Sequence, residues 1–418
     1  MSSDTIAAIA TGSGRGGIAV VRVSGPDSFS IARTLSGRDV RAGRITYAQT
    51  PIDDCVILAF KGPHSYTGED VVEFQCHGGT VTPRRMLEAC FANGARLARR
   101  GEFTQRAFLN ARLDYDQAKS VIELIDAKTD RAADAALEGL AGRRAKENKS
   151  LYERALRVSS TLEYALDVDE SDLGEKFFSS LRSEFAALSE ALKNAEKSIR
   201  EKRLLQNGAL VVLAGAPNSG KSSLLNALLE ENRAIVSDTP GTTRDAIEAW
   251  LDIDGWPVKI VDTAGLRTTS DQIEAQGVKR AEDLISKADI VIALDCDFPG
   301  AIKVHSKCDI SRASGLNVSA VTGEGIDELK SAVAKRLEEI SATPSDSTDA
   351  DFNDEALSVY VKALTELKNV EETITSSLDI VLAANTARII ANELGNLSGQ
   401  TYSSDLLEQL FSRFCVGK

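Results

Sequence analysis

The sequence of 418 residues has no run of about 18 or more apolar residues, the length that a membrane-spanning helix needs. Its first residues also lack the charged and apolar segments of a secretory signal peptide. The six cysteines form no C-x-x-C pair and have no histidines at zinc-ligand spacing, so we expect reduced thiols without a disulfide framework or zinc site. These absences predict a cytoplasmic protein with no membrane segment.

An overall excess of basic residues is lacking too, because the formal net charge is −13 at pH 7. This charge argues against a broad nucleic-acid-binding surface. One basic run remains a candidate for contact with RNA, and a solvated helix face explains it equally well. The run consists of Arg143, Arg144, Lys146, Lys149, Arg154 and Arg157.

A glycine-rich segment at residues 215–222 has the pattern G-x-x-x-x-G-K-[ST]. The apolar run before it predicts a buried strand, and the apolar residues after it predict a helix. In this context backbone N–H groups hold phosphate oxygens, the lysine neutralises charge and the serine hydroxyl binds Mg²⁺. We therefore predict a nucleotide site lined by Asn218, Ser219, Gly220, Lys221, Ser222 and Ser223.

Two further segments are candidates for Mg²⁺ and the terminal phosphate. Thr243 lies in a Gly-Thr-Thr-Arg-Asp segment, where its hydroxyl and backbone would meet both groups. Asp262 ends a predicted strand at 258–261 and would hold Mg²⁺ through water. The loop that it begins is expected to sense hydrolysis, and it contains Asp262, Thr263, Ala264 and Gly265.

Two other segments are candidates for contact with the base. Lys307 and Asp309 belong to Ser-Lys-Cys-Asp, which is similar to the guanine-binding N-K-x-D, and Ser319 with Ala320 would form the last base-contacting loop. Open parallel sheets bind ligands beyond the carboxyl ends of their strands, so the order of these segments predicts a GTPase. Ser306 replaces the expected asparagine, and loss of its hydrogen bond would cost about 1–3 kcal/mol.

The connections around this motif are short. Only residues 296–301 separate the predicted strand at 290–294 from the next strand, near 302–304, whereas a parallel crossover usually needs about a dozen residues. The link at 310–315 is equally short. We therefore expect a trimmed G domain that lacks a helix and binds nucleotide more weakly.

The N-terminal part of the chain is predicted to be a mixed α/β domain, with strands at 18–23, 54–60 and 71–75. Residues 12–17 match the dinucleotide pattern G-x-G-x-x-G. A strand follows them instead of a helix, which leaves no helix N-terminus for a pyrophosphate. We predict a tight glycine turn between two strands there.

Helical periodicity predicts two separate helical segments. One stripe consists of Leu181, Phe185, Leu188 and Leu192, and a second consists of Leu364, Leu367, Val370 and Ile374. Neither segment has much else to pack against, so we expect them to associate. The nucleotide-binding domain would then be an insertion in one helical domain.

Motifs at both ends make the sequence similar to the MnmE (TrmE) family of tRNA modification GTPases. They lie at residues 14–25, 66–75 and 101–110, and in the closing Cys-Val-Gly-Lys at 415–418. The resemblance implies α/β plus α-helical architecture. Its parts are a tetrahydrofolate-binding and dimerisation domain at 1–115, a helical domain at 116–205 and 341–418, and an inserted P-loop G domain at 206–340.

The resemblance also implies partners and chemistry. It implies a homodimer that joins a flavoprotein, MnmG, in a heterotetramer acting on tRNA. A one-carbon tetrahydrofolate would supply the unit for a (carboxymethyl)aminomethyl group at C5 of the wobble uridine, and GTP hydrolysis would drive the cycle.

The implied folate-binding residues are Arg22, Glu73, Arg112 and Lys418. Cations suit the glutamate tail of folate, and Glu73 can accept hydrogen bonds from pterin N–H groups. Arg112 stands where the family has lysine. Considered alone, each is an ordinary surface or strand-end charge. Cys415 is either a reactive thiol near the folate or a small buried thiol.

The implied catalytic residues are Lys221, Thr243 and Glu274. Leu266 replaces the glutamine that orients water in many GTPases, so Glu274 would act through a bridging water. The other interpretation of Glu274 is an exposed helix-start glutamate. A potassium ion between paired G domains would neutralise charge, and its implied ligands are Asn218, Ser237, Thr239 and Thr242.

Three other functions remain open from the residues alone. A GTPase switch of the ribosome-assembly kind explains the G domain but leaves the first 115 residues without a purpose. A nucleotide-binding scaffold with weak hydrolysis would explain Leu266 and the short connections. A folate-dependent methyltransferase that does not use GTP leaves the phosphate loop unexplained.

Overall fold

The computed structural model describes residues 4–12, 14–168, 173–231, 248–262, 283–342, 355–376, 379–399, 407 and 410–418. The chain divides into two compact units. One unit combines Met1–Ile122, Gly139–Gly142 and Gln400–Lys418, and the other combines Glu123–Glu138 and Arg143–Gly399. In the described parts of the chain, no helix is both long and apolar enough to cross a membrane.

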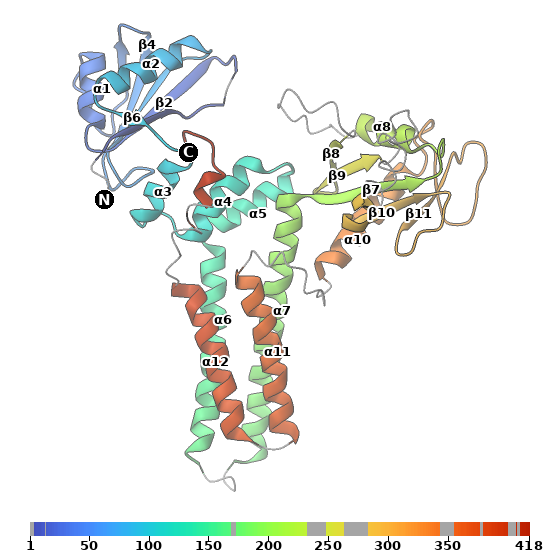
Figure 1. Ribbon diagram of the computed structural model, residues 1–418. Helices are drawn as coiled ribbons and strands as arrows, with labels where there is room; N and C mark the ends of the chain where they lie inside the picture. The colour runs from blue at the N-terminus through green and yellow to red at the C-terminus, as the bar shows by residue number, and fades with distance from the viewer. Residues whose placement is uncertain are drawn as a thin grey trace. The chain divides into compact units, whose positions relative to one another are not determined.

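The N-terminal unit is built on a six-stranded sheet with the order β3-β4-β5-β2-β1-β6. Its strands are β1 (Ile6–Ile9), β2 (Ile18–Ser24), β3 (Thr46–Gln49), β4 (Asp54–Phe60), β5 (Val71–His77) and β6 (Arg96–Leu97). Alternate residues of β4 are buried, as expected for a sheet with one covered face. Helices α1 (Ser28–Ser36) and α2 (Val81–Ala92) pack on that face (Figure 1). The predicted strands are confirmed.

The glycine pattern at residues 12–17 lies in the connection between β1 and β2, which pair antiparallel. A strand follows it, as predicted. The connection spans residues 10–17 and is longer than the predicted tight turn.

The C-terminal residues pack against the N-terminal unit. Leu410, Phe411 and Phe414 form a small core with Ala118 of α4 (Tyr115–Asp126). The N–H of Phe103, in α3 (Glu102–Leu109), donates to the carbonyl oxygen of Lys418 at 3.3 Å. The closing Cys-Val-Gly-Lys is therefore part of this unit, although residues 341–418 were predicted to belong together to the helical domain.

The helical domain is a bundle of α6 (Arg143–Leu166), α7 (Glu175–Asn207), α11 (Glu355–Ser376) and α12 (Ile380–Gly399) (Figure 1). The four residues of the predicted stripe on α7 are all buried in one core with side chains from α11 and α12. A buried hydrogen bond from Tyr360 to Asn148 joins the two sequence segments. Their association, on either side of an inserted G domain, is confirmed.

The G domain contains a second six-stranded sheet, with the order β12-β11-β10-β7-β9-β8. Its elements are β7 (Ala209–Gly215), α8 (Lys221–Glu231), β8 (Glu248–Ile253), β9 (Trp256–Asp262), β10 (Ile290–Leu294), β11 (Ile302–Ser306), β12 (Leu316–Val318) and α10 (Ile326–Ala342). The strands from β12 to β9 pair in parallel, and β8 is antiparallel. Parallel pairing brings the carboxyl ends of β7, β9 and β11 to one edge.

The trimmed connections are confirmed. β10 and β11 are parallel neighbours, yet residues 295–301 join them without a helix. Ile302 lies opposite Ile292, the middle residue of β10. The connection therefore runs back along only the last residues of β10 before β11 begins to pair. This register lets a short connection do what normally needs about a dozen residues. Residues 307–315 join β11 to β12, also without a helix.

Candidate functional site

The phosphate loop leaves the end of β7 at Gly215 and enters α8 at Lys221. A Cβ on Gly215 would lie 2.8 Å from the carbonyl oxygen of Leu294, so only glycine fits there. The Lys221 side chain is buried, and its Nζ donates to the carbonyl oxygens of Gly215 at 2.9 Å and Ala216 at 2.7 Å. The loop therefore curls around the ammonium group that is predicted to neutralise phosphate charge.

The two described residues predicted to meet Mg²⁺ lie in contact. The Ser222 hydroxyl donates to Oδ2 of Asp262 at 2.6 Å, and Asp262 is buried at the end of β9. A hydroxyl and a carboxylate are oxygen ligands of the kind that Mg²⁺ prefers. The residues present therefore fit the predicted ion. Ser223, next on α8, is exposed.

The predicted base-binding residues come together in two contacts. Lys307 has a left-handed backbone with φ +56°, and its Nζ donates to the carbonyl oxygen of Asn218 in the phosphate loop at 2.9 Å. The Ser319 hydroxyl donates to Oδ1 of Asp309 at 2.6 Å, and the half-buried Ala320 follows it. Lys307 thus reaches the phosphate loop, and Asp309 is held by Ser319 of the loop that is predicted to contact the base.

Sequence reasoning did not identify the partners of Ser306. Its hydroxyl and backbone N–H both donate to the carboxylate of Asp295, at 2.5 and 3.2 Å. Oδ1 of Asp295 also lies 2.8 Å from Nδ1 of His305. The sequence signal that could have identified Asp295 is its place directly after a buried strand, at the sheet edge where ligands bind.

Several predicted residues lie outside the described part of the chain, so their roles stay predictions. They are Ser237, Thr239, Thr242, Thr243, Thr263, Ala264, Gly265, Leu266 and Glu274. The proposed potassium ligands therefore include one described residue, Asn218, which has φ +63° at the tip of the phosphate loop.

The predicted folate residues Arg22 and Glu73 face each other across β2 and β5, with Nε 2.8 Å from Oε1. The Arg22 guanidinium also lies over two aromatic rings, 5.2 Å from the centroid of Tyr66 and 5.7 Å from that of Phe103. Burial and the Arg22 charge lower the pKa of Lys418, and the Glu73 charge opposes them. Three of the four predicted residues therefore gather at one place, and Tyr66 and Phe103 were missed.

This cluster suits a folate in its chemistry. It combines a carboxylate acceptor for ring N–H groups, two cations for carboxylates and two aromatic surfaces. Arg112 donates to the carbonyl oxygen of Ser65 at 3.2 Å, beside Tyr66. Cys415 is exposed, so the interpretation as a buried thiol is wrong.

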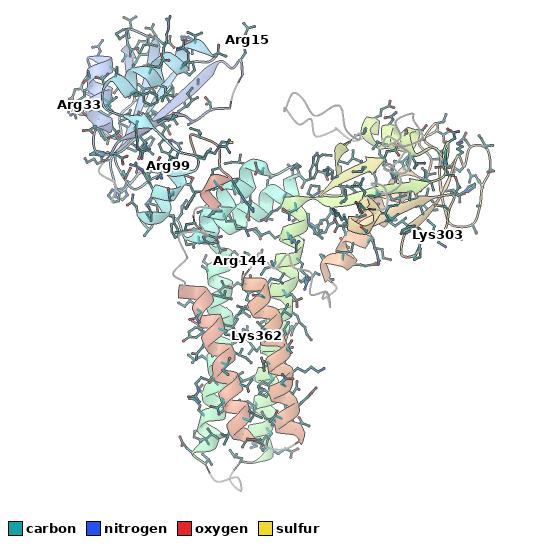
Figure 2. The ribbon with its side chains drawn as sticks, in the orientation of Figure 1. Arg15, Arg33, Arg99, Arg144, Lys303 and Lys362 are labelled. Carbon is teal, nitrogen blue, oxygen red and sulfur yellow. The ribbon has the colours of Figure 1, made fainter. Side chains whose placement is uncertain are left out.

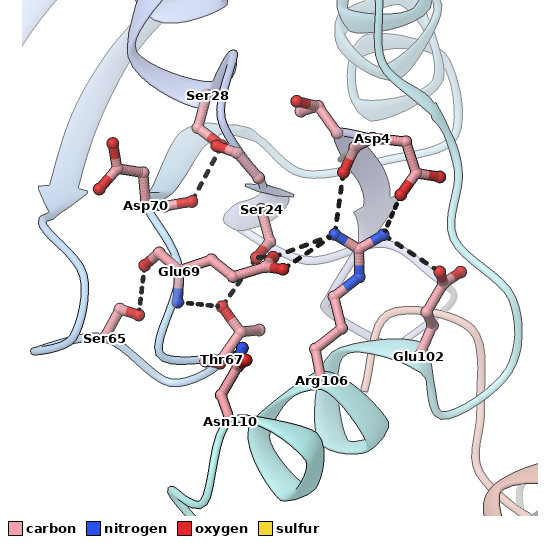
Figure 3. A network of polar contacts seen from close by, with 12 residues as sticks. Asp4, Ser24, Ser28, Ser65, Thr67, Glu69, Asp70, Glu102, Arg106 and Asn110 are labelled. Carbon is pink, nitrogen blue, oxygen red and sulfur yellow. Dashed lines mark hydrogen bonds and ion pairs between the residues drawn. The ribbon is translucent and has the colours of Figure 1, made fainter. Parts of the chain in front are cut away.

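An ion-pair network around the buried Arg106 includes Glu69, in the loop that also carries Tyr66. The Arg106 guanidinium contacts carboxylate oxygens of Asp4 at 2.9 Å, Glu69 at 3.0 Å and Glu102 at 3.2 Å (Figure 3). Figure 3 shows Arg106 reaching from α3 toward the loop of residues 65–70. Arg106 is 4% exposed, so it joins the segment before β1, this loop and α3 in an environment of low dielectric constant.

The basic run that was a candidate for RNA contact begins α6, where Arg144 lies (Figure 2). Arg143, Lys146, Lys149 and Arg157 are exposed, and Arg144 and Arg154 are half-buried. Arg143 forms an ion pair with Glu138. Contact with RNA at this run stays a prediction.

A phosphate loop, a serine–aspartate pair suited to Mg²⁺ and a guanine-binding motif on a mostly parallel sheet define a P-loop protein of the GTPase class. Residues 5–112 match the family model of the GTP-binding protein TrmE N-terminus. Residues 116–415 match that of the MnmE helical domain.

Curated relatives match the whole chain. A protein named tRNA modification GTPase MnmE from Symbiobacterium thermophilum is 40% identical over 465 residues and covers 100% of both chains. Proteins of the same name are 36% identical in Synechocystis sp. and 37% identical in Alkalilimnicola ehrlichii, with at least 99% of each chain covered. The chain belongs to the MnmE family of tRNA modification GTPases.

The 465 aligned positions of the Symbiobacterium relative exceed the 418 residues of this chain. Some positions of that relative therefore have no counterpart here, in keeping with the helix-free connections of the G domain.

Proposed function

We propose that this chain is a GTP hydrolase that acts in tRNA modification. The observation that carries the proposal is the contact between Ser222 and Asp262 beside the buried Lys221. It joins a hydroxyl and a carboxylate at the start of α8, next in sequence to the ammonium group of Lys221, and these three groups would together hold a Mg²⁺–phosphate group. The charge that develops on a transferred phosphoryl group is what such an arrangement stabilises.

Hydrolysis is proposed to depend on potassium. The phosphate loop offers Asn218 as an oxygen ligand, with Ser237, Thr239 and Thr242 as further candidates. Pairing of two G domains around the ion would supply the positive charge that an arginine finger supplies elsewhere. Glu274 would position the attacking water, since Leu266 cannot.

The N-terminal cluster is proposed to bind a one-carbon tetrahydrofolate. Arg22, Glu73 and Lys418 would contact it, and Arg112 would contribute from the neighbouring loop. With a homodimer and the flavoprotein MnmG as partners, the one-carbon unit would become part of the aminomethyl-type group at C5 of the tRNA wobble uridine.

The experiment is steady-state GTP hydrolysis by the full chain with Mg²⁺ in KCl and in matched NaCl. We expect faster turnover in KCl for the unaltered chain, and the Asn218→Ala variant should lose most of that difference. Lys221→Ala should remove hydrolysis in both salts, because it deletes the ammonium group. Binding of 5-formyltetrahydrofolate, measured by calorimetry on the same protein, tests the folate site separately.

The results separate the proposal from its alternatives. Equal rates in KCl and NaCl would contradict the potassium site. Slow turnover in both salts, with nucleotide binding retained, would favour the scaffold, which the helix-free connections also favour. Hydrolysis without folate binding would favour a GTPase switch of the ribosome-assembly kind.

A further inference from the structure

We propose that Asp295 is a positioning residue for guanine recognition: it holds the base-binding loop in place where the G domain lacks both the asparagine of the N-K-x-D motif and the flanking helices. The proposal rests on the proposed function, because it concerns how the same site selects its nucleotide.

Asp295 is the first residue after β10, and its backbone is left-handed with φ +53°. Its N–H donates to the carbonyl oxygen of Val304 at 3.0 Å, which extends the pairing with β11. The backbone then turns so that the carboxylate faces the end of β11. A non-glycine residue adopts this conformation uncommonly, although aspartate is among the residues that tolerate it best. The turn directs the side chain at Ser306.

The carboxylate makes three contacts with two consecutive residues. Oδ2 accepts from the Ser306 hydroxyl at 2.5 Å, and Oδ1 accepts from the Ser306 N–H at 3.2 Å. Oδ1 also lies 2.8 Å from Nδ1 of His305. A charged acceptor makes stronger hydrogen bonds than a neutral one. Asp295 therefore fixes the end of β11 immediately before Lys307.

His305 continues the network into the loop. Its Nε2 lies 3.0 Å from the carbonyl oxygen and 3.3 Å from the hydroxyl of Ser311. Hydrogen bonds thus hold the residues on both sides of the base-binding residues 307–309, Ser306 before them and Ser311 after them. Asp295 and His305 together span a loop that has no helix of its own.

The contacts of Ser306 and Ser311, on either side of residues 307–309, determine where the two base-binding side chains lie. Lys307 has φ +56° and reaches Asn218, and Asp309 accepts from Ser319 through Oδ1, so that Oδ2 would serve the base. A carboxylate that accepts guanine N–H groups must be held within a fraction of an ångström. Loss of the Asp295 contacts would therefore reduce guanine selectivity more than phosphate binding, because the phosphate loop is held by β7 and α8.

The test compares the affinities of fluorescent mant-GDP and mant-ADP for the full chain. We expect the unaltered chain to favour GDP and Asp295→Ala to weaken GDP binding by about tenfold or more, while ADP binding changes by less than about twofold. In steady-state hydrolysis the same variant should raise KM for GTP more than it lowers kcat. Asp295→Asn, which keeps an acceptor for the Ser306 N–H, should retain part of the selectivity.

Asp297→Ala is the matched control, because Asp297 lies in the same connection but is exposed and pairs only with Lys303 among its described contacts. It should leave the ratio of GDP to ADP affinity unchanged. If Asp295→Ala fails to fold, Ser306→Ala removes the hydroxyl contact alone and should lower the ratio by several-fold. An unchanged ratio in the Asp295 and Ser306 variants overturns the proposal. Equal affinities for GDP and ADP in the unaltered chain would instead overturn the guanine site itself, and the positioning role with it.

Discussion

Gly417 lies so close to Ile9 that a Cβ on the glycine would stand 2.2 Å from the Ile9 carbonyl oxygen. The glycine also has φ +105°, a conformation that L side chains rarely adopt. The penultimate residue of the chain is therefore fitted against β1, and this contact places Lys418 beside Arg22 and Glu73. The C-terminus is a structural part of the candidate folate site.

The first prediction follows from that contact. Gly417→Ala should displace the C-terminal residues and weaken binding of 5-formyltetrahydrofolate by about tenfold or more, since the Lys418 ammonium would leave the cluster. Gly94→Ala is a close control, because Gly94 has φ +103° but open space around its Cβ position. It carries similar backbone strain without the clash. Calorimetry measures the affinity of both variants for 5-formyltetrahydrofolate, and equal affinities in the two variants would contradict the prediction.

The second prediction concerns the carboxylate of the same cluster. Glu73→Gln should weaken folate binding by about tenfold, because the amide loses the charge that accepts pterin N–H groups and neutralises Arg22. Glu88→Gln alters an exposed glutamate paired with Arg84 on α2 and should leave binding unchanged. Unaltered affinity in Glu73→Gln would show that the pterin ring does not bind at Glu73 on β5.

Sequence patterns predicted those parts of the molecule that depend on local periodicity. The phosphate loop lies between β7 and α8, the stripe on α7 is buried, and the connection of residues 295–301 has no helix. Each follows from a spacing of apolar residues or from the number of residues available. Such signals are contained within one segment, so tertiary structure did not alter them.

Other features were not predictable because they join segments distant in the sequence. Asp295 meets Ser306 across two strands, and Arg22 lies over Tyr66 and Phe103 from separate loops and helices. Neither contact has a spacing rule, because the first depends on the register of β10 and β11 and the second on how a loop and α3 pack against β2. The resemblance placed Lys418 at the folate site, but the packing of Leu410, Phe411 and Phe414 against α4 was missed, since a short apolar group does not specify its partner.

The third prediction compares two adjacent serines at the start of α8. Ser222→Ala should reduce GTP hydrolysis by about tenfold or more and raise the Mg²⁺ concentration for half-maximal activity, because the hydroxyl that contacts Asp262 is lost. Ser223→Ala should have a smaller effect, since the hydroxyl that contacts Asp262 belongs to Ser222 and the Ser223 N–H is retained. A Mg²⁺ titration of both variants is the measurement, and equal midpoints would exclude Ser222 as a ligand.

The fourth prediction concerns acid stability of the network around Arg106. Burial alone would raise the pKa of the Glu102 carboxyl, but hydrogen bonds from Arg96, the Arg99 N–H and Arg106 outweigh it and lower the pKa from 4.5 to about 2. Because the pKa is lower in the folded state, this group stabilises the fold above about pH 4.5. The contribution is lost as the pH falls from about 4.5 to about 2, and it is on the order of 3 kcal/mol.

Glu102→Gln should therefore unfold more easily at pH 7, and its stability should vary less over that pH window. The measurement is urea unfolding of the full chain, followed in the N-terminal unit by hydrogen exchange of backbone N–H groups in peptides from residues 65–110. Both tryptophans, Trp250 and Trp256, lie in the G domain, so their fluorescence reports a separate transition that the variant should leave in place. Glu88→Gln again serves as the exposed control. Equal pH dependence in Glu102→Gln and the unaltered chain would show that the network does not hold this carboxyl ionised, and the loop that carries Tyr66 would then owe its position to packing alone.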